Sequence, residues 1–186
     1  MNKYEIAKGS ISDLMQNENM TLAESFLTCD CVVLFDVSGS MEMMDGTHES
    51  RYDRGVQQLK NLQASMPGKI AVVQFADSVQ FMPGGVPLMD ISGYGTDLAA
   101  GLRFIRIADV PEMRFIVISD GAPDSETMAL TEARKFTEKI DTVYIGSESG
   151  DGRDFLHRLA NASGGQSLDS AAENIEKDVV YLLNAG

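Results

Sequence analysis

Short apolar runs alternate with amphipathic stretches along most of this 186-residue chain. Runs that are apolar on both faces are typical of strands buried in a parallel sheet. Four such strands are predicted, at about Cys31 to Phe35, Lys69 to Phe75, Phe115 to Ser119 and Thr142 to Ile145. Two shorter strands are predicted at Val79 to Met82, where a preceding turn indicates a hairpin, and near Gln166 to Leu168.

Amphipathic segments between these strands predict helices. They run from about Ser12 to Leu27, Tyr52 to Ser65, Asp97 to Ala108, Ser125 to Ile140, Phe155 to Ala160 and Ala171 to Leu183. The alternation predicts an α/β fold, Rossmann-like and doubly wound. We expect a mainly parallel six-stranded sheet with one antiparallel edge strand and helices on both faces. Right-handed crossovers then place the loops after the first and later strands at one end of the sheet.

The first predicted strand ends in the segment Phe35-Asp36-Val37-Ser38-Gly39-Ser40-Met41. Open α/β sheets bind ligands at the carboxyl ends of their strands, so Asp36 is expected at a crevice. Together with Ser38 and Ser40 it offers hard oxygen donors, which suit Mg²⁺, Mn²⁺ or Ca²⁺. Taken alone, this motif is more often a strand-to-helix turn with a helix N-cap.

Two further segments place oxygen ligands at loop or strand ends and strengthen the metal hypothesis. One is Gly93-Tyr94-Gly95-Thr96-Asp97-Leu98, which precedes a predicted helix. The other is Ile116-Val117-Ile118-Ser119-Asp120-Gly121, an apolar strand that ends in Asp-Gly. Three ends of the predicted sheet therefore carry candidate ligands.

In this order the three motifs resemble the metal-ion-dependent adhesion site of the von Willebrand factor type A domain. The resemblance covers roughly residues 29 to 186 and leaves residues 1–28 as a helical N-terminal lead. It implies that a divalent cation, expected to be Mg²⁺ with Mn²⁺ or Ca²⁺ as alternatives, is bound directly or through water. The implied ligands are Asp36, Ser38, Ser40, Thr96 and Asp120. It also implies that one coordination position is left for a carboxylate of a partner protein.

Residues beside these motifs are candidate partner contacts, namely Met41, Glu42, Asp97 and Asp124. Methionine is common at adaptable binding surfaces. Packing into the core is the alternative, and the favoured one, for Met41 and its neighbours Met43 and Met44. A solvated loop charge is the favoured alternative for each aspartate.

Composition limits the functions that fit this chain. A hydrophobic content of 44% over 186 residues suits one domain with a substantial core. The net charge of −13 argues against direct nucleic-acid or anionic-membrane partners. A bilayer-spanning run and a signal-peptide pattern are both missing, so we expect a cytoplasmic protein. Cys29 and Cys31 are expected to be buried free thiols.

Enzymatic motifs fit poorly, and we expect no enzyme. A phosphoryl-transfer site of the haloacid dehalogenase kind needs Asp-x-Asp, but Ser38 occupies the second position. The nucleophile elbow Gly-x-Ser-x-Gly is missing around Ser38. Leu98 replaces the last glycine of a dinucleotide fingerprint, and a Walker lysine is missing. An EF-hand beginning at Asp36 would have Met41 at the turn glycine.

The sequence therefore predicts an intracellular, metal-dependent protein-binding module, an adaptor that recruits an Asp or Glu of a partner. One alternative is a subunit of a larger machine, working with an AAA+ ATPase of the MoxR type or in a chelatase-like complex. A second alternative is a domain of the same fold whose metal is only structural.

Overall fold

A computed structural model describes residues 5–18, 21, 24, 28–44, 48–89, 95–146 and 151–185. Six strands form one sheet: β1 (Cys31–Asp36), β2 (Ile70–Phe75), β3 (Val79–Met82), β4 (Arg114–Ser119), β5 (Ile140–Tyr144) and β6 (Ser167–Asp169). The strand order is β3-β2-β1-β4-β5-β6. All neighbouring pairs are parallel except β2 and β3, which are antiparallel. The predicted fold class, including the antiparallel edge strand, is confirmed.

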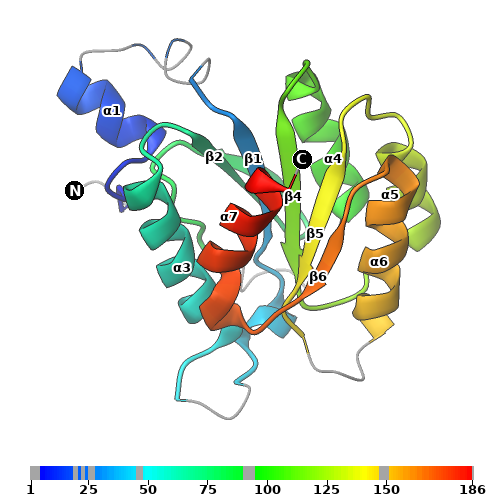
Figure 1. Ribbon diagram of the computed structural model, residues 1–186. Helices are drawn as coiled ribbons and strands as arrows, with labels where there is room; N and C mark the ends of the chain where they lie inside the picture. The colour runs from blue at the N-terminus through cyan, green and yellow to red at the C-terminus, as the bar shows by residue number, and fades with distance from the viewer. Residues whose placement is uncertain are drawn as a thin grey trace.

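Helices cover both faces of the sheet (Figure 1). They are α1 (Ile11–Glu18), α3 (Arg51–Ser65), α4 (Leu98–Ile105), α5 (Glu126–Ala133), α6 (Asp151–Ser163) and α7 (Ile175–Asn184), with short 3₁₀ turns at Gly39–Glu42, Arg106–Ala108 and Ala172–Asn174. α3 and α7 pack on one face, and α4, α5 and α6 pack on the other. None of the helices in the described part of the chain combines the length and apolar composition that a bilayer crossing requires.

The alternation of side chains along β1 builds two separate cores. Val33 and Phe35 point to the face covered by α3 and α7, whereas Val32 and Leu34 point to the face covered by α4 to α6. All four are at most 1% exposed. This double burial explains why the strand is apolar throughout instead of alternating with polar residues. Cys29 and Cys31 are buried free thiols, as expected, and burial raises the pKa of both.

The start of the chain is bonded to the rest of the domain. The Ala7 N–H donates to the Gly84 carbonyl at 2.8 Å, and the Ser12 N–H donates to the Pro83 carbonyl at 2.8 Å. Ile11 is 1% exposed and belongs to one of the two cores. Only part of the helix predicted from Ser12 to Leu27 can be compared, because α1 ends at Glu18 and residues 19, 20, 22, 23 and 25–27 lie outside the described residues.

The helix predicted from Ser125 to Ile140 is too long. α5 ends at Ala133, and β5 begins at Ile140, two residues earlier than predicted. The Asp109 carboxylate accepts hydrogen bonds from the N–H groups of Thr137, at 2.7 Å, and Glu138, at 3.0 Å. These bonds hold the segment as a loop. α6 is longer than predicted, and the first turn of the last predicted helix is a 3₁₀ turn.

Candidate metal centre

Asp36 ends β1 and is completely buried. Its Oδ1 accepts a hydrogen bond from the Ser38 N–H at 2.8 Å, and its Oδ2 accepts one from the Ser119 hydroxyl at 2.6 Å. Burial raises the pKa of Asp36 to about 6; the bonds from Ser119 and Ser38 oppose this rise, and the Asp120 charge adds to it. The carboxylate is therefore fixed in place and is costly to ionise without a nearby cation.

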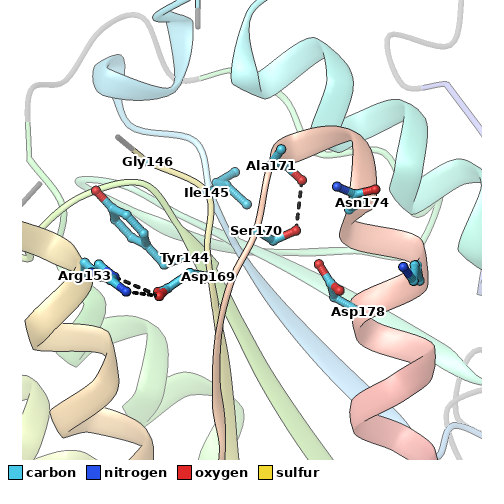
Figure 2. A pocket seen from close by; sticks show the side chains of 10 residues that line it. Tyr144, Ile145, Gly146, Arg153, Asp169, Ser170, Ala171, Asn174 and Asp178 are labelled. Carbon is cyan, nitrogen blue, oxygen red and sulfur yellow. Dashed lines mark hydrogen bonds and ion pairs between the residues drawn. The ribbon is translucent and has the colours of Figure 1, made fainter. Parts of the chain in front are cut away.

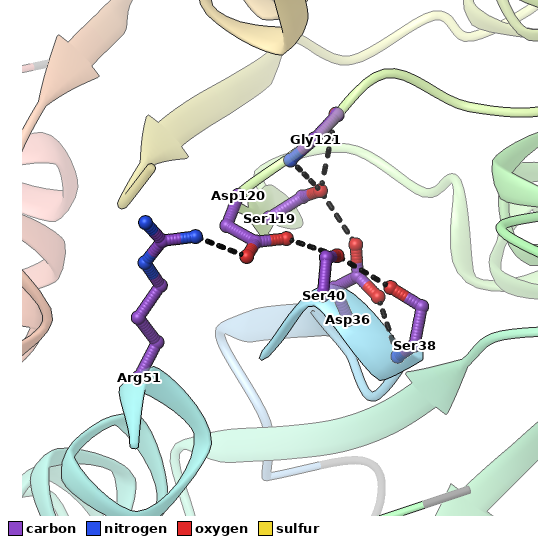
Figure 3. A network of polar contacts seen from close by, with 7 residues as sticks. All are labelled: Asp36, Ser38, Ser40, Arg51, Ser119, Asp120 and Gly121. Carbon is purple, nitrogen blue, oxygen red and sulfur yellow. Dashed lines mark hydrogen bonds and ion pairs between the residues drawn. The ribbon is translucent and has the colours of Figure 1, made fainter. Parts of the chain in front are cut away.

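Two serines continue from Asp36 toward the end of β4 (Figure 3). The hydroxyl oxygens of Ser38 and Ser40 are 3.2 Å apart, and the Ser40 hydroxyl donates to Asp120 Oδ1 at 2.7 Å. Ser40 lies in the 3₁₀ turn Gly39–Glu42, which follows β1. Four of the five predicted ligands, Asp36, Ser38, Ser40 and Asp120, thus form one hydrogen-bonded cluster.

Thr96, the fifth predicted ligand, lies in the loop that leads into α4. Its carbonyl accepts hydrogen bonds from the N–H groups of Leu98, at 2.9 Å, and Asp124, at 3.1 Å. The second bond ties this loop to the loop that follows Asp120. Within the described part of the chain, the half-buried Thr96 hydroxyl makes no hydrogen bond. The hydroxyl is therefore free to serve as a ligand.

The candidate partner contacts beside Ser40 differ in how far they are buried. Met41 is 0% exposed and packs in the core on the α3 side, so its assignment as a partner contact is wrong, and the favoured core interpretation is confirmed. Met43 and Met44 are 59% and 65% exposed, so for them the core interpretation is wrong. Glu42 is exposed. The segment after Ser40 therefore presents two apolar side chains and one carboxylate to solvent.

The two aspartates near the threonine loop also differ. Asp97 caps α4, because its Oδ1 accepts a hydrogen bond from the Ala100 N–H at 2.8 Å, and this gives it a structural role that was not predicted. Asp124 is exposed. A Cβ added to Gly95 would lie 3.0 Å from Asp124 Oδ2 and 1.9 Å from Asp77 Oδ1, so both carboxylates lie against the backbone beside Thr96. Three carboxylates, those of Asp77, Asp97 and Asp124, therefore lie beside Thr96.

Arg51 belongs to the cluster and was missed in the sequence. Its Nη1 donates to Asp120 Oδ2 at 2.7 Å (Figure 3). Both side chains are buried, at 10% and 0% exposure. The two residues are 69 positions apart, and Arg51 lies outside the three sequence motifs that carry the predicted ligands. The available signal is its position at the start of the helix that follows the Asp36 motif.

The donor set suits a hard divalent cation. The described residues contain no cluster of three or more His, Cys, Asp or Glu side chains that could hold a metal ion. A cation here must therefore use hydroxyl oxygens beside one or two carboxylates, which fits Mg²⁺, Mn²⁺ or Ca²⁺ better than thiophilic metals. Asp36, Ser38, Ser40 and Thr96 would hold the ion, and Asp120 would support it through Ser40. Such an ion would offer an electrophilic position to an incoming anion.

A pocket of ≈ 600 Å³ lies at the carboxyl ends of β5 and β6, between α6 and α7 (Figure 2). The Arg153 Nε donates to Asp169 Oδ2 at 2.7 Å, and His157 lies 3.1 Å from the second oxygen of that carboxylate. The hydrogen bond from Arg153 is the main cause that lowers the pKa of Asp169. The Asp169 carboxylate is thus already occupied by protein groups, and the Asp36 cluster remains the stronger candidate site.

No model of a protein family matches this chain, and no curated protein matches its sequence. Solved structures do match its fold. An aerotolerance-related membrane protein from Bacteroides fragilis is 14% identical, with a TM-score of 0.68 over 84% of this chain and 98% of that chain. Proximal thread matrix protein 1 from the mussel byssus, in a structure with a zinc-occupied MIDAS motif, is 17% identical, with a TM-score of 0.59 over 84% of this chain and 47% of that chain.

A third similar structure is the manganese-loaded TRAP protein of Plasmodium vivax, 15% identical, with a TM-score of 0.55 over 83% of this chain and 73% of that chain. These likenesses concern the fold, which in this chain is a six-stranded, mainly parallel sheet with one antiparallel edge strand. The chain therefore has the fold of a von Willebrand factor type A domain.

Proposed function

We propose that this chain is a metal-dependent protein-binding module, in which a divalent cation held by Asp36, Ser38, Ser40 and Thr96 accepts a carboxylate of a partner protein. The observation that carries this proposal is the hydrogen-bonded chain from Asp36 through Ser38 and Ser40 to Asp120. Two structures of similar fold contain a metal, one zinc and one manganese. These support a divalent cation, and we propose Mg²⁺ as the native ion.

Charge explains why an acidic partner fits. The two carboxylates of the cluster and the neutral hydroxyls around them do not saturate a divalent cation, so an incoming carboxylate would still be attracted to it. Without the ion, the same surface repels acids, because Asp77, Asp97 and Asp124 lie near Thr96. Metal binding would therefore switch this surface from repelling acidic groups to attracting them.

Exposed Met43 and Met44 extend the proposed contact. They follow the 3₁₀ turn that carries Ser40, and more than half of each residue is exposed. Adjacent exposed apolar side chains that are rimmed by polar residues are typical of protein contact surfaces. We propose that the partner places apolar side chains next to its Asp or Glu. Three statements remain predictions from the sequence: the intracellular adaptor role, the cytoplasmic location and the lack of enzymatic activity. The alternative, in which the chain works with an AAA+ ATPase, also remains a prediction.

Calorimetric titration of Mg²⁺, Mn²⁺ and Ca²⁺ into EDTA-stripped protein tests the proposal. We expect one saturable site that Asp36→Ala abolishes. Asp30→Asn is the matched control, because Asp30 precedes β1 at the opposite end of the sheet, where it pairs with Lys69. A wild-type protein that binds none of the three ions would contradict the proposed function. Metal binding that is unchanged in Asp36→Ala would show that the metal binds at another site.

Capture of a partner needs a second measurement, which separates the binding module from a fold with a structural metal. Peptides that carry a central Glu among apolar residues would be compared with the same peptides carrying Gln. Binding that requires both Glu and Mn²⁺ supports the module. If the metal raises the free energy of unfolding but no carboxylate binds the loaded protein, the metal is structural.

A further inference from the structure

We infer that Arg51 tunes the proposed metal site, acting through Asp120: it keeps this carboxylate from binding the metal directly and leaves the loaded site with a net positive charge for an anionic ligand. This inference rests on the proposed function and deepens it. Arg51 is a positioning residue in this scheme, because its guanidinium contacts Asp120 and neither the ion nor the partner.

Both oxygens of Asp120 are already used. Oδ1 accepts from the Ser40 hydroxyl at 2.7 Å, and Oδ2 accepts from Arg51 Nη1 at 2.7 Å. A direct bond to the metal would have to displace one of these donors. The Asp120 side chain is 0% exposed and that of Arg51 is 10% exposed, so separating the pair would leave a buried charge without a partner, which is costly. Asp120 is therefore held as a support for Ser40.

Backbone and capping hydrogen bonds fix the position of Arg51 at the start of α3. The Arg51 N–H donates to the Met43 carbonyl at 3.1 Å, which joins α3 to the segment that carries the serines. One residue earlier, the Ser50 hydroxyl accepts from the Asp53 N–H at 3.0 Å and donates to Asp53 Oδ2 at 2.8 Å. This reciprocal cap starts the helix at one defined residue. The guanidinium is thus aimed at Asp120 by the same turn that positions the metal ligands.

Helix stability does not explain the arginine. A positive charge in the first turn of a helix opposes the helix dipole, so a structural design would favour an acidic or neutral residue there. In addition, the Arg51 Nε is buried without a hydrogen-bond partner among the described residues. Both features cost stability, and both follow from placing a cation beside Asp120.

The charge of Arg51 affects the binding of both the metal and an anionic ligand. Within the hydrogen-bonded cluster alone, Asp36 and Asp120 contribute two negative charges and Arg51 contributes one positive charge, so this cluster carries −1 without metal. The aspartates beside Thr96 lie outside this count and are the same with and without Arg51. A divalent cation then brings the cluster to +1, whereas the same cluster without Arg51 would be neutral when loaded. Arg51 therefore weakens the attraction for the metal and strengthens the attraction of the loaded site for a carboxylate.

Removal of this charge tests the inference. In Arg51→Met we expect Mn²⁺ to bind at least about tenfold more tightly in calorimetry, because the positive charge that now pairs with Asp120 no longer repels a divalent ion. We also expect acetate to bind the Mn²⁺-loaded variant at least about threefold more weakly, as followed by proton relaxation of metal-bound water. Arg51→Lys, which keeps the charge, should retain the wild-type affinity for both within about threefold.

Arg54→Met is the matched control. Arg54 lies one turn further along α3, is 11% exposed, and pairs with Glu173 at 2.5 Å, away from the cluster. It should leave both affinities unchanged. If Arg51→Met does not fold, Arg51→Gln tests the same loss of charge with a polar side chain that can still donate to Asp120.

The outcomes separate this inference from the proposed function. A wild-type protein that does not bind Mn²⁺ contradicts the proposed function. A wild-type protein that binds Mn²⁺, together with neutral variants that bind it equally or more weakly, overturns only the role of Arg51. That result would mean that Arg51 merely holds the ligands in place.

Discussion

The Ser119 hydroxyl donates a 2.6 Å hydrogen bond to Asp36 Oδ2 and thereby joins the ends of the two central strands, β4 and β1. This bond is the strongest of the influences that hold the pKa of Asp36 below the value that burial alone would give. Ser119 thus controls the charge of Asp36 without being one of the predicted ligands.

Ser119→Ala is therefore expected to weaken metal binding. Loss of this hydrogen bond raises the pKa of Asp36 further above 6, so a larger fraction of the carboxyl is protonated near neutral pH and must ionise before it binds the ion. For a rise of about one in this pKa, we expect the Mn²⁺ affinity to fall about twofold at pH 7 and close to tenfold below pH 6, and the pH at which binding is half lost to rise. Ser119→Thr, which keeps the hydroxyl, should behave like the wild type. Calorimetry between pH 5.5 and about 8 measures both effects, and an unchanged pH midpoint in the alanine variant would contradict the argument.

Asp36→Asn is expected to stabilise the metal-free protein at neutral pH. The pKa of Asp36 is raised from 3.8 to about 6 in the folded state, so the ionised form is disfavoured by folding. Below pH about 4 the carboxyl is protonated in both states and nothing is lost. As the pH rises through about 4 to 6, the wild type loses roughly 3 kcal/mol of its free energy of unfolding through this group, which the neutral amide does not lose.

Urea unfolding in EDTA at several pH values measures this difference. The free energy of unfolding of Asp36→Asn minus that of the wild type should increase by roughly 3 kcal/mol between pH 4 and 7. The remaining carboxyl groups cancel in the subtraction, because they are present in both proteins. A constant or decreasing difference would show that the pKa of Asp36 is not raised in the folded state.

Thr96→Ala is expected to separate metal binding from folding. The structural hydrogen bonds of Thr96 are made by its carbonyl, with the N–H groups of Leu98 and Asp124, and the substitution keeps this carbonyl. The free energy of unfolding without metal should therefore change by less than about 0.5 kcal/mol. The loss of one metal ligand should weaken Mn²⁺ binding about tenfold or more, while Thr96→Ser should restore it. A large loss of stability in metal-free Thr96→Ala would assign the hydroxyl a structural role.

The central sheet could be predicted from the sequence because both faces of its strands are buried. Runs such as Val32 to Phe35 and Phe115 to Ile118 are apolar at every position, and short runs of this kind are typical of strands covered on both sides. The Asp36 motif could also be recognised, because its three oxygen donors are close together in the sequence. Local patterns were sufficient for both.

Contacts between distant segments could not be predicted. Phe136 fits the apolar stripe of the helix predicted from Ser125 to Ile140, yet it packs edge-to-face on Phe115 from a loop, with ring centroids 5.0 Å apart. The Asp109 carboxylate, which holds that loop, lies 28 residues before Thr137. In the same way, the Arg51 to Asp120 ion pair spans 69 residues. Such pairs are determined by the packing of the whole domain, and the periodicity of apolar residues along the sequence does not predict them.

Two methionines near the metal centre should respond differently to truncation. Met41 is 0% exposed and packs in the core between β1 and α3, whereas Met43, two residues later, is 59% exposed. Met41→Ala should lower the free energy of unfolding by about 2–5 kcal/mol, because it leaves a cavity in a close-packed core. Met43→Ala should change it by less than about 0.5 kcal/mol. Urea unfolding of both variants in EDTA measures the contrast, and equal effects would contradict the assignment of Met41 to the core and Met43 to the surface offered to a partner.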